Sequence, residues 1–438
     1  MSQINLTKQA VANIPSDGKI AIYTTTGGNI ATRDSLGNVH EYSPTPLESE
    51  SMIYGVRWDS VNDIMTPGIV VNGSFIATDY QNYPIQEKMI RGLLTETGVW
   101  TPLNPYDSSK LVNGSTATID GSAGQVVTRI SRHYVLDMID GDYKYFLNSE
   151  QPFGFNGIQA WIPPAFGNGA FLYLGAFQGV ALTDSVSANV GSCVLDTSGY
   201  TTNSYPNPFT NRTLPQFRTQ CAHGVFSQMN YCQYEVIYRL ALTEFKTWKL
   251  QEKLEGNTEY SSFDYAKATP AGATLGLGNY SGSIWSETEG KYIANSYRGI
   301  ENPFGNVHQW LDGANIDTND NQRLWVCCNP ANYASDTTTN YIDTGCASGI
   351  DNTDNYIKDV YGTGKYASLF PISNTGASSS TFISDYLWTA ALGSGWRVLV
   401  ARGGLSHGRL AGFGSRYASL SSSSSYSYLG VRLAAVNI

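Results

Sequence analysis

One segment of the 438-residue sequence shows the periodicity of a long α-helix, and this limits the fold more than any other feature. Four apolar side chains of segment 231–254 recur at steps of four and three residues and so share one helical face: Ile237, Ala241, Phe245 and Trp248. Asn230 and Gln233 have the spacing of an amino-terminal capping pair, and Gly256 is expected to end the helix. One buried helix among strand-like segments predicts an α+β fold.

Most of the remaining sequence favours β-strands joined by polar loops. Charged residues make up only 14% of the chain, whereas Gly (44) and Tyr (29) are abundant, and this composition is typical of strand-rich proteins. Segments 125–138 and 143–148 are predicted to be paired strands. Segment 85–94 is predicted to be a short helix, because Ile85, Met89 and Leu93 fall on one side.

The first fifty residues indicate a small separate unit. Segment 17–44 consists of short alternating runs broken by Gly-containing turns, which predicts a β-meander of two or three strands. Such a meander has too little apolar surface to be stable alone, so we expect it to pack against copies of itself or another protein. Residues 43–51 are typical of a linker. We therefore predict two domains, residues 1–45 and 46–438.

Charge and hydropathy exclude several classes of protein. The net charge of −9 and the pI near 5.1 disfavour a nucleic-acid-binding protein, since a phosphate backbone attracts a basic face. No run approaches eighteen apolar residues, and the amino-terminal segment lacks the apolar core of a signal peptide. We expect synthesis in a cytoplasm without export by the general secretory route.

The cysteines show no metal-ligand spacing. None of the six forms a C-x-x-C pair, and the five histidines are scattered. This pattern favours reduced, buried thiols over a zinc site. The cysteines are Cys193, Cys221, Cys232, Cys327, Cys328 and Cys346.

After Gly256, more than a hundred residues show little regular periodicity. Aromatic residues recur through this stretch and are expected to anchor its loops to a core, so we predict long, ordered loops. These residues are Trp285, Tyr292, Tyr297, Phe304, Trp310 and Trp325.

The carboxyl-terminal segment, Tyr386–Ile438, contains no Asp, Glu or Lys, and it suggests a positively charged tip on an acidic protein. It contains five arginines: Arg397, Arg402, Arg409, Arg416 and Arg432. Two predicted strands, 395–404 and 428–436, flank segment 405–428, which is rich in Ser, Tyr, Gly and Arg. That mixture is typical of evolved binding loops, because Tyr and Arg provide contact area while Ser and Gly adapt. A flexible Gly/Ser linker is the alternative, but the flanking strands favour a displayed binding surface.

An ordered series of motifs resembles the C-type-lectin-like domain of phage receptor-binding proteins whose tips are diversified by a retroelement, a group related in fold to the formylglycine-generating enzyme. The resemblance covers most of residues 54–438, and residues 17–39 resemble the virion-attaching ends of phage fibre proteins. The motifs are YGVRWDS (54–60), IQEKMIRGLL (85–94), RISRHYVLDM (129–138), WIPPAFGNGAFLYLGAFQG (161–179), YRGIENPFGNVHQWLDGANI (297–316), ASLFPISNTGASSSTFISDYLW (367–388), GSGWRVLVARGG (393–404) and YLGVRLA (428–434).

The resemblance implies a variable region at about residues 397–433. In that family, diversification at adenines cannot produce Lys, Glu, Gln, Met or Trp, and segment 405–428 contains none of these. By position, the candidate receptor-binding residues are Leu405, Ser406, His407, Arg409, Leu410, Phe413, Ser415, Arg416, Tyr417, Tyr426 and Tyr428.

The implied protein is a homotrimeric phage tail fibre or other exterior fibre of the virion. Residues 1–45 would bind other virion proteins, and the lectin-like domain would bind a glycan or protein receptor on the bacterial surface. No catalytic residue, cofactor, metal or nucleic acid is expected. Two alternatives remain open: a structural head, collar or tail decoration protein, and a glycan depolymerase, which would need two carboxylates that no sequence pattern marks.

Other chemical motifs are incomplete. Segment 404–408 matches the G-x-S-x-G nucleophile pattern, but no Asp, Glu or His follows His407. Cys346 is the last cysteine, so the resemblance to the formylglycine-generating enzyme is confined to the fold. Two acidic clusters lack a full calcium loop and are interpreted as solvated turns: Asp317 with Asp320, and Asp351 with Asp354.

Overall fold

The computed structural model describes residues 52–346, 353–381, 383–389, 394–401 and 403–436, together with the backbone of three short strands nearer the amino terminus. The chain divides into two compact units, Met1–Met52 and Ile53–Ile438.

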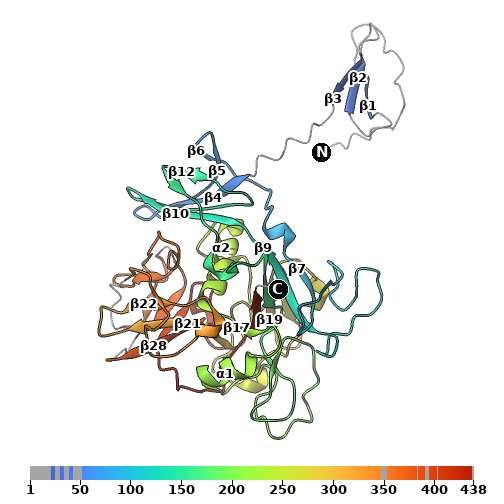
Figure 1. The fold of residues 1–438 in the computed structure, drawn as a ribbon, viewed down its shortest axis with the longest axis vertical. Coiled ribbons are helices and arrows are strands. Elements are labelled where there is room, and N and C mark those ends of the chain that lie inside the picture. The colour runs from blue at the N-terminus through green and yellow to red at the C-terminus, as the bar shows by residue number, and fades with distance from the viewer. Residues whose placement is uncertain are drawn as a thin grey trace. The chain divides into compact units, whose positions relative to one another are not determined.

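The first unit contains a three-stranded antiparallel sheet, labelled in Figure 1. Its strands follow one another along the chain, as the predicted meander requires. They are β1 (Ala21–Thr24), β2 (Ile30–Arg33) and β3 (Val39–Tyr42).

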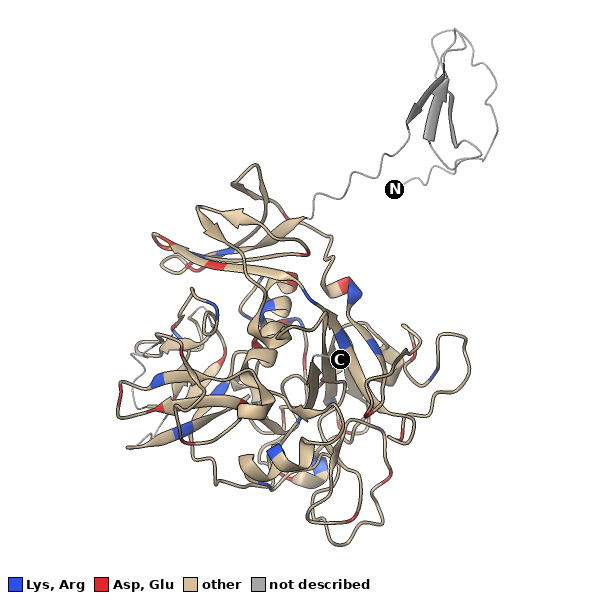
Figure 2. Ribbon diagram, in the orientation of Figure 1, with Lys and Arg blue, Asp and Glu red and all other residues tan. Residues whose placement is uncertain are grey.

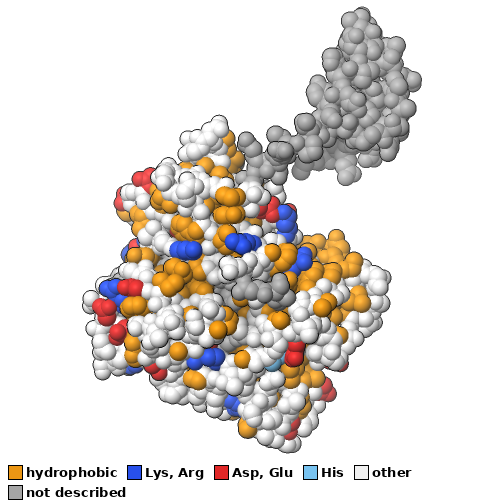
Figure 3. All heavy atoms as spheres, viewed as in Figure 1, with side chains coloured by type: hydrophobic (Ala, Val, Ile, Leu, Met, Phe, Trp, Pro, Cys, Tyr) orange, Lys and Arg blue, Asp and Glu red, His pale blue; other side chains and the backbone are white. Residues whose placement is uncertain are grey.

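A five-stranded antiparallel sheet begins the second unit, with the order β10-β11-β4-β5-β6. Its strands are β4 (Ile53–Asp59), β5 (Ile64–Val71), β6 (Ser74–Ala77), β10 (Tyr134–Asp140) and β11 (Tyr143–Ser149). This sheet and its turns carry several exposed apolar side chains, and the space-filling view shows hydrophobic groups interspersed with polar ones over this part of the molecule (Figure 3). The exposed residues are Val61, Ile64, Val71, Ile76, Ile139 and Tyr143.

A six-stranded sheet has the order β17-β31-β14-β9-β7-β8. Its strands are β7 (Ile90–Leu94), β8 (Trp100–Pro102), β9 (Gln125–Ser131), β14 (Phe171–Gly175), β17 (Ser227–Gln228) and β31 (Leu433–Val436). The predicted helix at 85–94 is therefore wrong: only a 3-10 turn forms at Gln86–Lys88, and β7 follows it. Pairing of β7 with β8 and β9 overrides the local periodicity.

The largest sheet has eight strands in the order β23-β22-β21-β28-β29-β27-β24, with β30 pairing beside β21. Its strands are β21 (His308–Asp317), β22 (Arg323–Val326), β23 (Ile342–Asp343), β24 (Asn355–Tyr356), β27 (Tyr386–Trp388), β28 (Trp396–Ala401), β29 (Arg416–Leu420) and β30 (Leu429–Gly430). The predicted strand near 395–404 is confirmed as β28. The terminal segment forms two strands, β30 and β31, in different sheets.

Short sheets order much of the rest. They comprise β12 (Gly154–Phe155) with β13 (Ile158–Gln159), β15 (Val180–Ala181) with β16 (Val190–Gly191), β18 (Gly282–Ser286) with β19 (Lys291–Tyr297) and β20 (Ile300–Glu301), and β25 (Asp359–Val360) with β26 (Pro371–Ser373). Of the predicted aromatic anchors, Tyr297, Phe304 and Trp310 are buried, whereas Trp285 is 47% exposed and does not anchor its loop.

The central helix, α2 (Tyr231–Phe245), contacts β4 and β11 of the five-stranded sheet and β21 of the eight-stranded sheet (Figure 1). The predicted Asn230–Gln233 capping box is present. The helix ends earlier than predicted, with Lys246 in the left-handed conformation (φ 57°). Trp248 then turns into the core against Trp58, with ring centroids 5.1 Å apart.

The described residues contain two α-helices, α2 and α1 (Leu214–Cys221), and the rest of their regular structure is largely strand. The fold is therefore mainly β rather than α+β. A common core joins the six- and eight-stranded sheets, with Val127 and Leu433 from one packing near Trp310 and Val400 from the other. The carboxyl-terminal segment thus contributes strands to both sheets.

Cys232, in the first turn of α2, forms a disulfide with Cys328. The expectation of six reduced thiols is wrong for this pair, whose Cα atoms lie 6.3 Å apart although 96 residues separate them in sequence. No local spacing could have indicated the contact. The free, buried cysteines are Cys193, Cys221, Cys327 and Cys346.

Candidate receptor-binding surface

Segment 405–428 runs between β28 and β30, in the red part of the chain in Figure 1. It contains the 3-10 turn Gly408–Leu410 and strand β29. Strand β29 pairs antiparallel with β28 and parallel with β27. The segment is therefore built into the eight-stranded sheet, and a flexible linker does not describe it.

Four of the eleven predicted binding residues are buried, so the expectation that they are exposed is wrong. Their fractional exposures are between 0% and 1%, which leaves no side-chain surface for a receptor. They are Leu405, Phe413, Ser415 and Arg416.

Arg416 is held by the central helix instead of facing solvent. Its Nη2 donates to Glu235 Oε1 at 3.0 Å, its Nη1 donates to the Phe413 carbonyl at 2.6 Å, and its guanidinium carbon lies 4.6 Å from the Tyr234 ring centroid. Burial raises the pKa of Glu235, and the adjacent Arg416 opposes this rise by favouring the carboxylate. Arg416 thus ties β29 to α2.

Phe413 fills an aromatic cluster beneath the loop. Its ring is stacked on Tyr238, with an interplanar angle of 7°, and contacts Tyr234, Tyr297 and Phe304 at centroid distances of 5.5–6.4 Å. Such packing is a large apolar contribution to the core. Phe413 therefore has a framework role.

Asp385 fixes the backbone between these two side chains. Its Oδ2 accepts from the Gly414 N–H at 2.6 Å, and a Cβ placed on Gly412 would lie 1.7 Å from its Oδ1. Burial raises the pKa of Asp385 to about 7, although the Gly414 hydrogen bond and Arg416 partly offset that effect. Only glycine at 412 allows the loop to approach this carboxyl so closely.

The other seven predicted residues keep some exposed surface. Arg409 and Tyr426 are exposed, and Tyr426 has 42% of its surface accessible. The half-buried members are Ser406, His407, Leu410, Tyr417 and Tyr428. These seven form the remaining candidate surface.

The backbone below this surface is hydrogen-bonded to distant elements. The Leu405 N–H donates to the Asn306 carbonyl at 3.1 Å, and the Gly408 N–H donates to the Thr258 carbonyl at 2.8 Å. The Tyr428 carbonyl accepts from the His308 N–H at 2.9 Å. Side chains can differ here without changing these backbone contacts.

A row of aromatic rings connects the two ends of the segment. Successive centroids lie 4.7–5.6 Å apart, in the range of direct ring contact. Tyr426 stacks on Tyr428 with an interplanar angle of 8°. The row consists of Phe263, Tyr428, His308, His407, Trp388, Tyr386 and Tyr356.

Five of these rings were not among the predicted site residues: Phe263, His308, Trp388, Tyr386 and Tyr356. One local signal existed for two of them, because Tyr386 and Trp388 are two residues apart in a strand and therefore share a face. The others come from segments that only the tertiary fold brings near residue 407.

The serine run is anchored at one position. Ser422 is buried and its Oγ donates to Asp336 Oδ2 at 2.8 Å, while its carbonyl accepts from the Leu214 N–H at the start of α1. Ser423 and Ser425 are exposed. The run is thus an ordered turn against α1.

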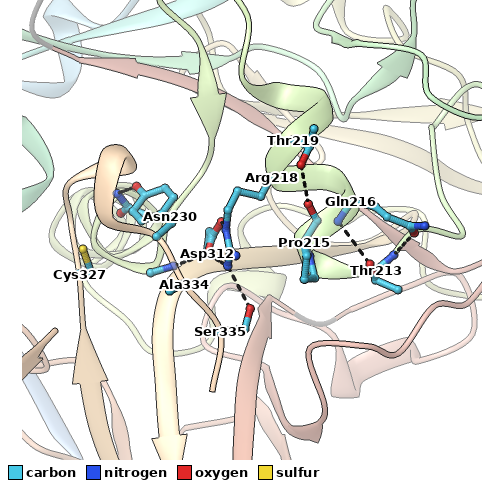
Figure 4. A network of polar contacts seen from close by, with 12 residues as sticks. Thr213, Pro215, Gln216, Arg218, Thr219, Asn230, Asp312, Cys327, Ala334 and Ser335 are labelled. Carbon is cyan, nitrogen blue, oxygen red and sulfur yellow. Dashed lines mark hydrogen bonds and ion pairs between the residues drawn. The ribbon is translucent and has the colours of Figure 1, made fainter. Parts of the chain in front are cut away.

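Helix α1 is itself fixed to β21, as Figure 4 shows. Arg218 forms a two-point ion pair with Asp312, with Nε–Oδ2 and Nη2–Oδ1 distances of 2.7 and 2.8 Å. Thr213 and Gln216 form a capping box at its start. The support for the serine turn is therefore rigid.

The predicted positive tip is largely absent. Arg432 is buried and donates to the Gly175 and Glu301 carbonyls at 2.7 Å, and Arg397 is half-buried. Arg402 lies outside the described residues. In Figure 2, Lys and Arg of the described chain lie singly on different elements. Burial of arginine between sheets accounts for the discrepancy.

The described residues contain neither a cluster of metal ligands nor a helix that could cross a membrane. Among the described residues, no group of three or more His, Cys, Asp or Glu side chains is arranged to hold a metal ion. Asp320 pairs with Arg323, Asp354 accepts from the Thr389 N–H, and Asp351 lies outside the described residues. Neither described α-helix is both long and apolar enough to cross a membrane.

No family model and no curated protein matches this chain. Among solved structures, it is similar to one described as "Major Tropism Determinant P3c Variant", with 10% sequence identity, 99% of each chain covered and a TM-score of 0.26. A likeness at that TM-score carries no inference about this chain.

Proposed function

We propose that this chain is a phage virion protein that adheres to a bacterial host surface. In this proposal residues 53–438 form a C-type-lectin-like domain, and its receptor-binding surface consists of the seven accessible residues of segment 405–428, which the aromatic row supports. Residues 1–45 attach the chain to other virion proteins. The motif series in the sequence supports the family, and the geometry of the terminal segment supports the role.

One observation carries the proposal: the side chains that fix the backbone of the segment are different from the side chains that it exposes to solvent. Arg416, Phe413 and Asp385 hold the segment from below, and Tyr426 and Arg409 project from it. Positions that can change while the framework stays fixed are what a diversified receptor-binding surface requires.

The exposed chemistry suits a carbohydrate or protein receptor. Arg409 is available for an acidic group, and the stacked Tyr426 and Tyr428 offer aromatic faces on which sugar rings or apolar side chains pack. Binding involves no chemical step in this proposal. Individual contacts of this kind are weak, so several copies, most simply a homotrimer, supply the strength by avidity. The exposed apolar residues of the five-stranded sheet offer surface for contacts between copies or with other virion components.

Competition for adsorption tests the proposal. Purified protein added to host cells should block attachment of the phage that carries it, and the double variant Tyr426→Ala/Tyr428→Ala should lose most of this blocking. A matched control is the stacked pair Tyr106–Tyr280, whose centroids are 5.7 Å apart and whose side chains are 67% and 48% exposed. Tyr106→Ala/Tyr280→Ala should block as the parent does.

Either of two results would overturn the proposal and identify a different function. Normal adsorption but defective particle assembly in phage carrying the Tyr426→Ala/Tyr428→Ala variant would identify a structural decoration protein. Release of reducing ends from purified host capsule by the isolated chain would identify a depolymerase.

A further inference from the structure

A cavity of about 650 Å³ lies among the end of β31, the segment that follows β22, the start of β23 and the segment between β25 and β26. Ile162, Pro164 and Val326 line part of it, and polar side chains, several of them amides, line much of the rest. A concave site of this size, with apolar walls and a few polar groups, is typical of small-ligand sites. It shares no residue with segment 405–428.

The charges at this cavity have one sign. Arg132 and Lys365 line it, and its lining includes no Asp or Glu. Both cations are exposed, and neither forms an ion pair with another described residue. In a chain of net charge −9, an uncompensated cationic cavity selects for an anion.

Asparagine amides and a tyrosine ring also line the cavity, and they suit a sugar. Asn168, Asn332 and Asn340 line the cavity, and an amide side chain both donates and accepts hydrogen bonds. Tyr366 contributes aromatic surface and a hydroxyl. Groups of these kinds match the alternating hydroxyls and apolar faces of a sugar ring.

A smaller cavity of about 30 Å³ shares four lining residues with the first and reaches α2. Arg239 and Asp137 line it, both are buried, and Arg239 Nη1 and Asp137 Oδ1 have no hydrogen-bond partner among the described residues. A buried donor and acceptor beside a space of this size accommodate one water-sized polar group.

We propose that the larger cavity binds a small acidic saccharide. Its carboxylate pairs with Lys365 and Arg132, its hydroxyls bond to the asparagine amides, and its apolar face packs on Tyr366 and Pro164. A hydroxyl of the ligand or a water occupies the small cavity. This site is independent of the proposed host-binding surface.

Calorimetric titration of the full chain with an oligosaccharide of galacturonic acid tests the site. We expect the acidic oligomer to bind with a millimolar or lower dissociation constant and its binding to weaken with added salt. The neutral galactose oligomer should bind at least about tenfold more weakly, because it lacks the charge-assisted contact. Lys365→Ala should weaken binding by about tenfold. Lys253→Ala, an exposed lysine that lines neither cavity, should leave it unchanged.

Further variants distinguish the outcomes. Asn332→Trp should fill the cavity and abolish binding while the melting temperature stays that of the parent. Tyr426→Ala/Tyr428→Ala should bind the saccharide normally, so failure of the host-binding proposal would not affect this one. Equal binding of acidic and neutral oligomers, no effect of Lys365→Ala, or full displacement by an equal concentration of inorganic phosphate would overturn the assignment.

Discussion

The two halves of the predicted surface differ in composition and in role: residues 421–428 are six Ser and two Tyr, whereas residues 405–417 also contain Leu, Gly, Arg and Phe. Residues 405–417 contain all four buried members, and their Arg and Phe side chains bind the central helix. In residues 421–428, Tyr426 is exposed over a turn that Ser422 anchors. Residue type alone does not distinguish framework from display in such a segment, because Arg416 is buried whereas Arg409, in the same half, is exposed.

The largest expected difference in stability is between a buried and an exposed arginine of the first half, Arg416 and Arg409. Arg416→Ala would leave Glu235, whose side chain is only 14% exposed, without its partner, which should lower the free energy of unfolding by about 3–5 kcal/mol. Arg409→Ala removes an exposed side chain and should change it by less than about 0.5 kcal/mol. Urea denaturation of both variants measures this difference, and equal effects would remove the distinction between framework and displayed residues.

A second prediction concerns pH and Asp385, which contacts the first half at Gly414. Because the folded-state pKa of Asp385 is raised to about 7, the folded state holds its proton more tightly than the unfolded state does. Its contribution to stability is complete below the unfolded pKa near 3.8 and is lost as the pH rises through 7. Between pH 5 and pH 8 this loss should be roughly 2.5 kcal/mol.

Asp385→Asn keeps an acceptor for the Gly414 N–H and removes the titration. Between pH 5 and pH 8 the parent should therefore lose more stability than the variant. The other titrating groups are present in both proteins, so their contributions cancel in the comparison. Parallel stability profiles for the two proteins would show that Asp385 is not buried as described.

The smallest difference lies within the serine run. Ser422→Ala removes the hydrogen bond to Asp336 and should cost about 1 kcal/mol. Ser425→Ala, at an exposed position, should fall within about 0.5 kcal/mol of the parent. Thermal denaturation of the two variants separates them, and a larger effect at position 425 would contradict the anchored turn.

Local signals in the sequence predicted part of the fold. The Asn230–Gln233 capping box and strand β28 are short-range features and were correct. In segment 85–94, residues 90–94 form strand β7 because β8 and β9 pair with them. The mainly β character was underestimated because regular pairing extends through segments that lack periodicity, such as β21.

The site was harder to predict, because partners far apart in sequence determine burial. Glu235 and Arg239 are four residues apart on one helix and would be expected to pair with each other. In the structure Glu235 binds Arg416 and Arg239 binds Asp137, on two other elements. The aromatic row around His407 likewise requires the tertiary fold.

Two randomised libraries test the central claim most directly. One varies Ser406, Arg409, Tyr426 and Tyr428, and the other varies Leu405, Phe413, Ser415 and Arg416; the fraction of members that resist protease measures folding. We predict that most of the first library folds and that very little of the second does. Equal fractions of folded members in the two libraries would contradict a fixed framework beneath a changeable surface.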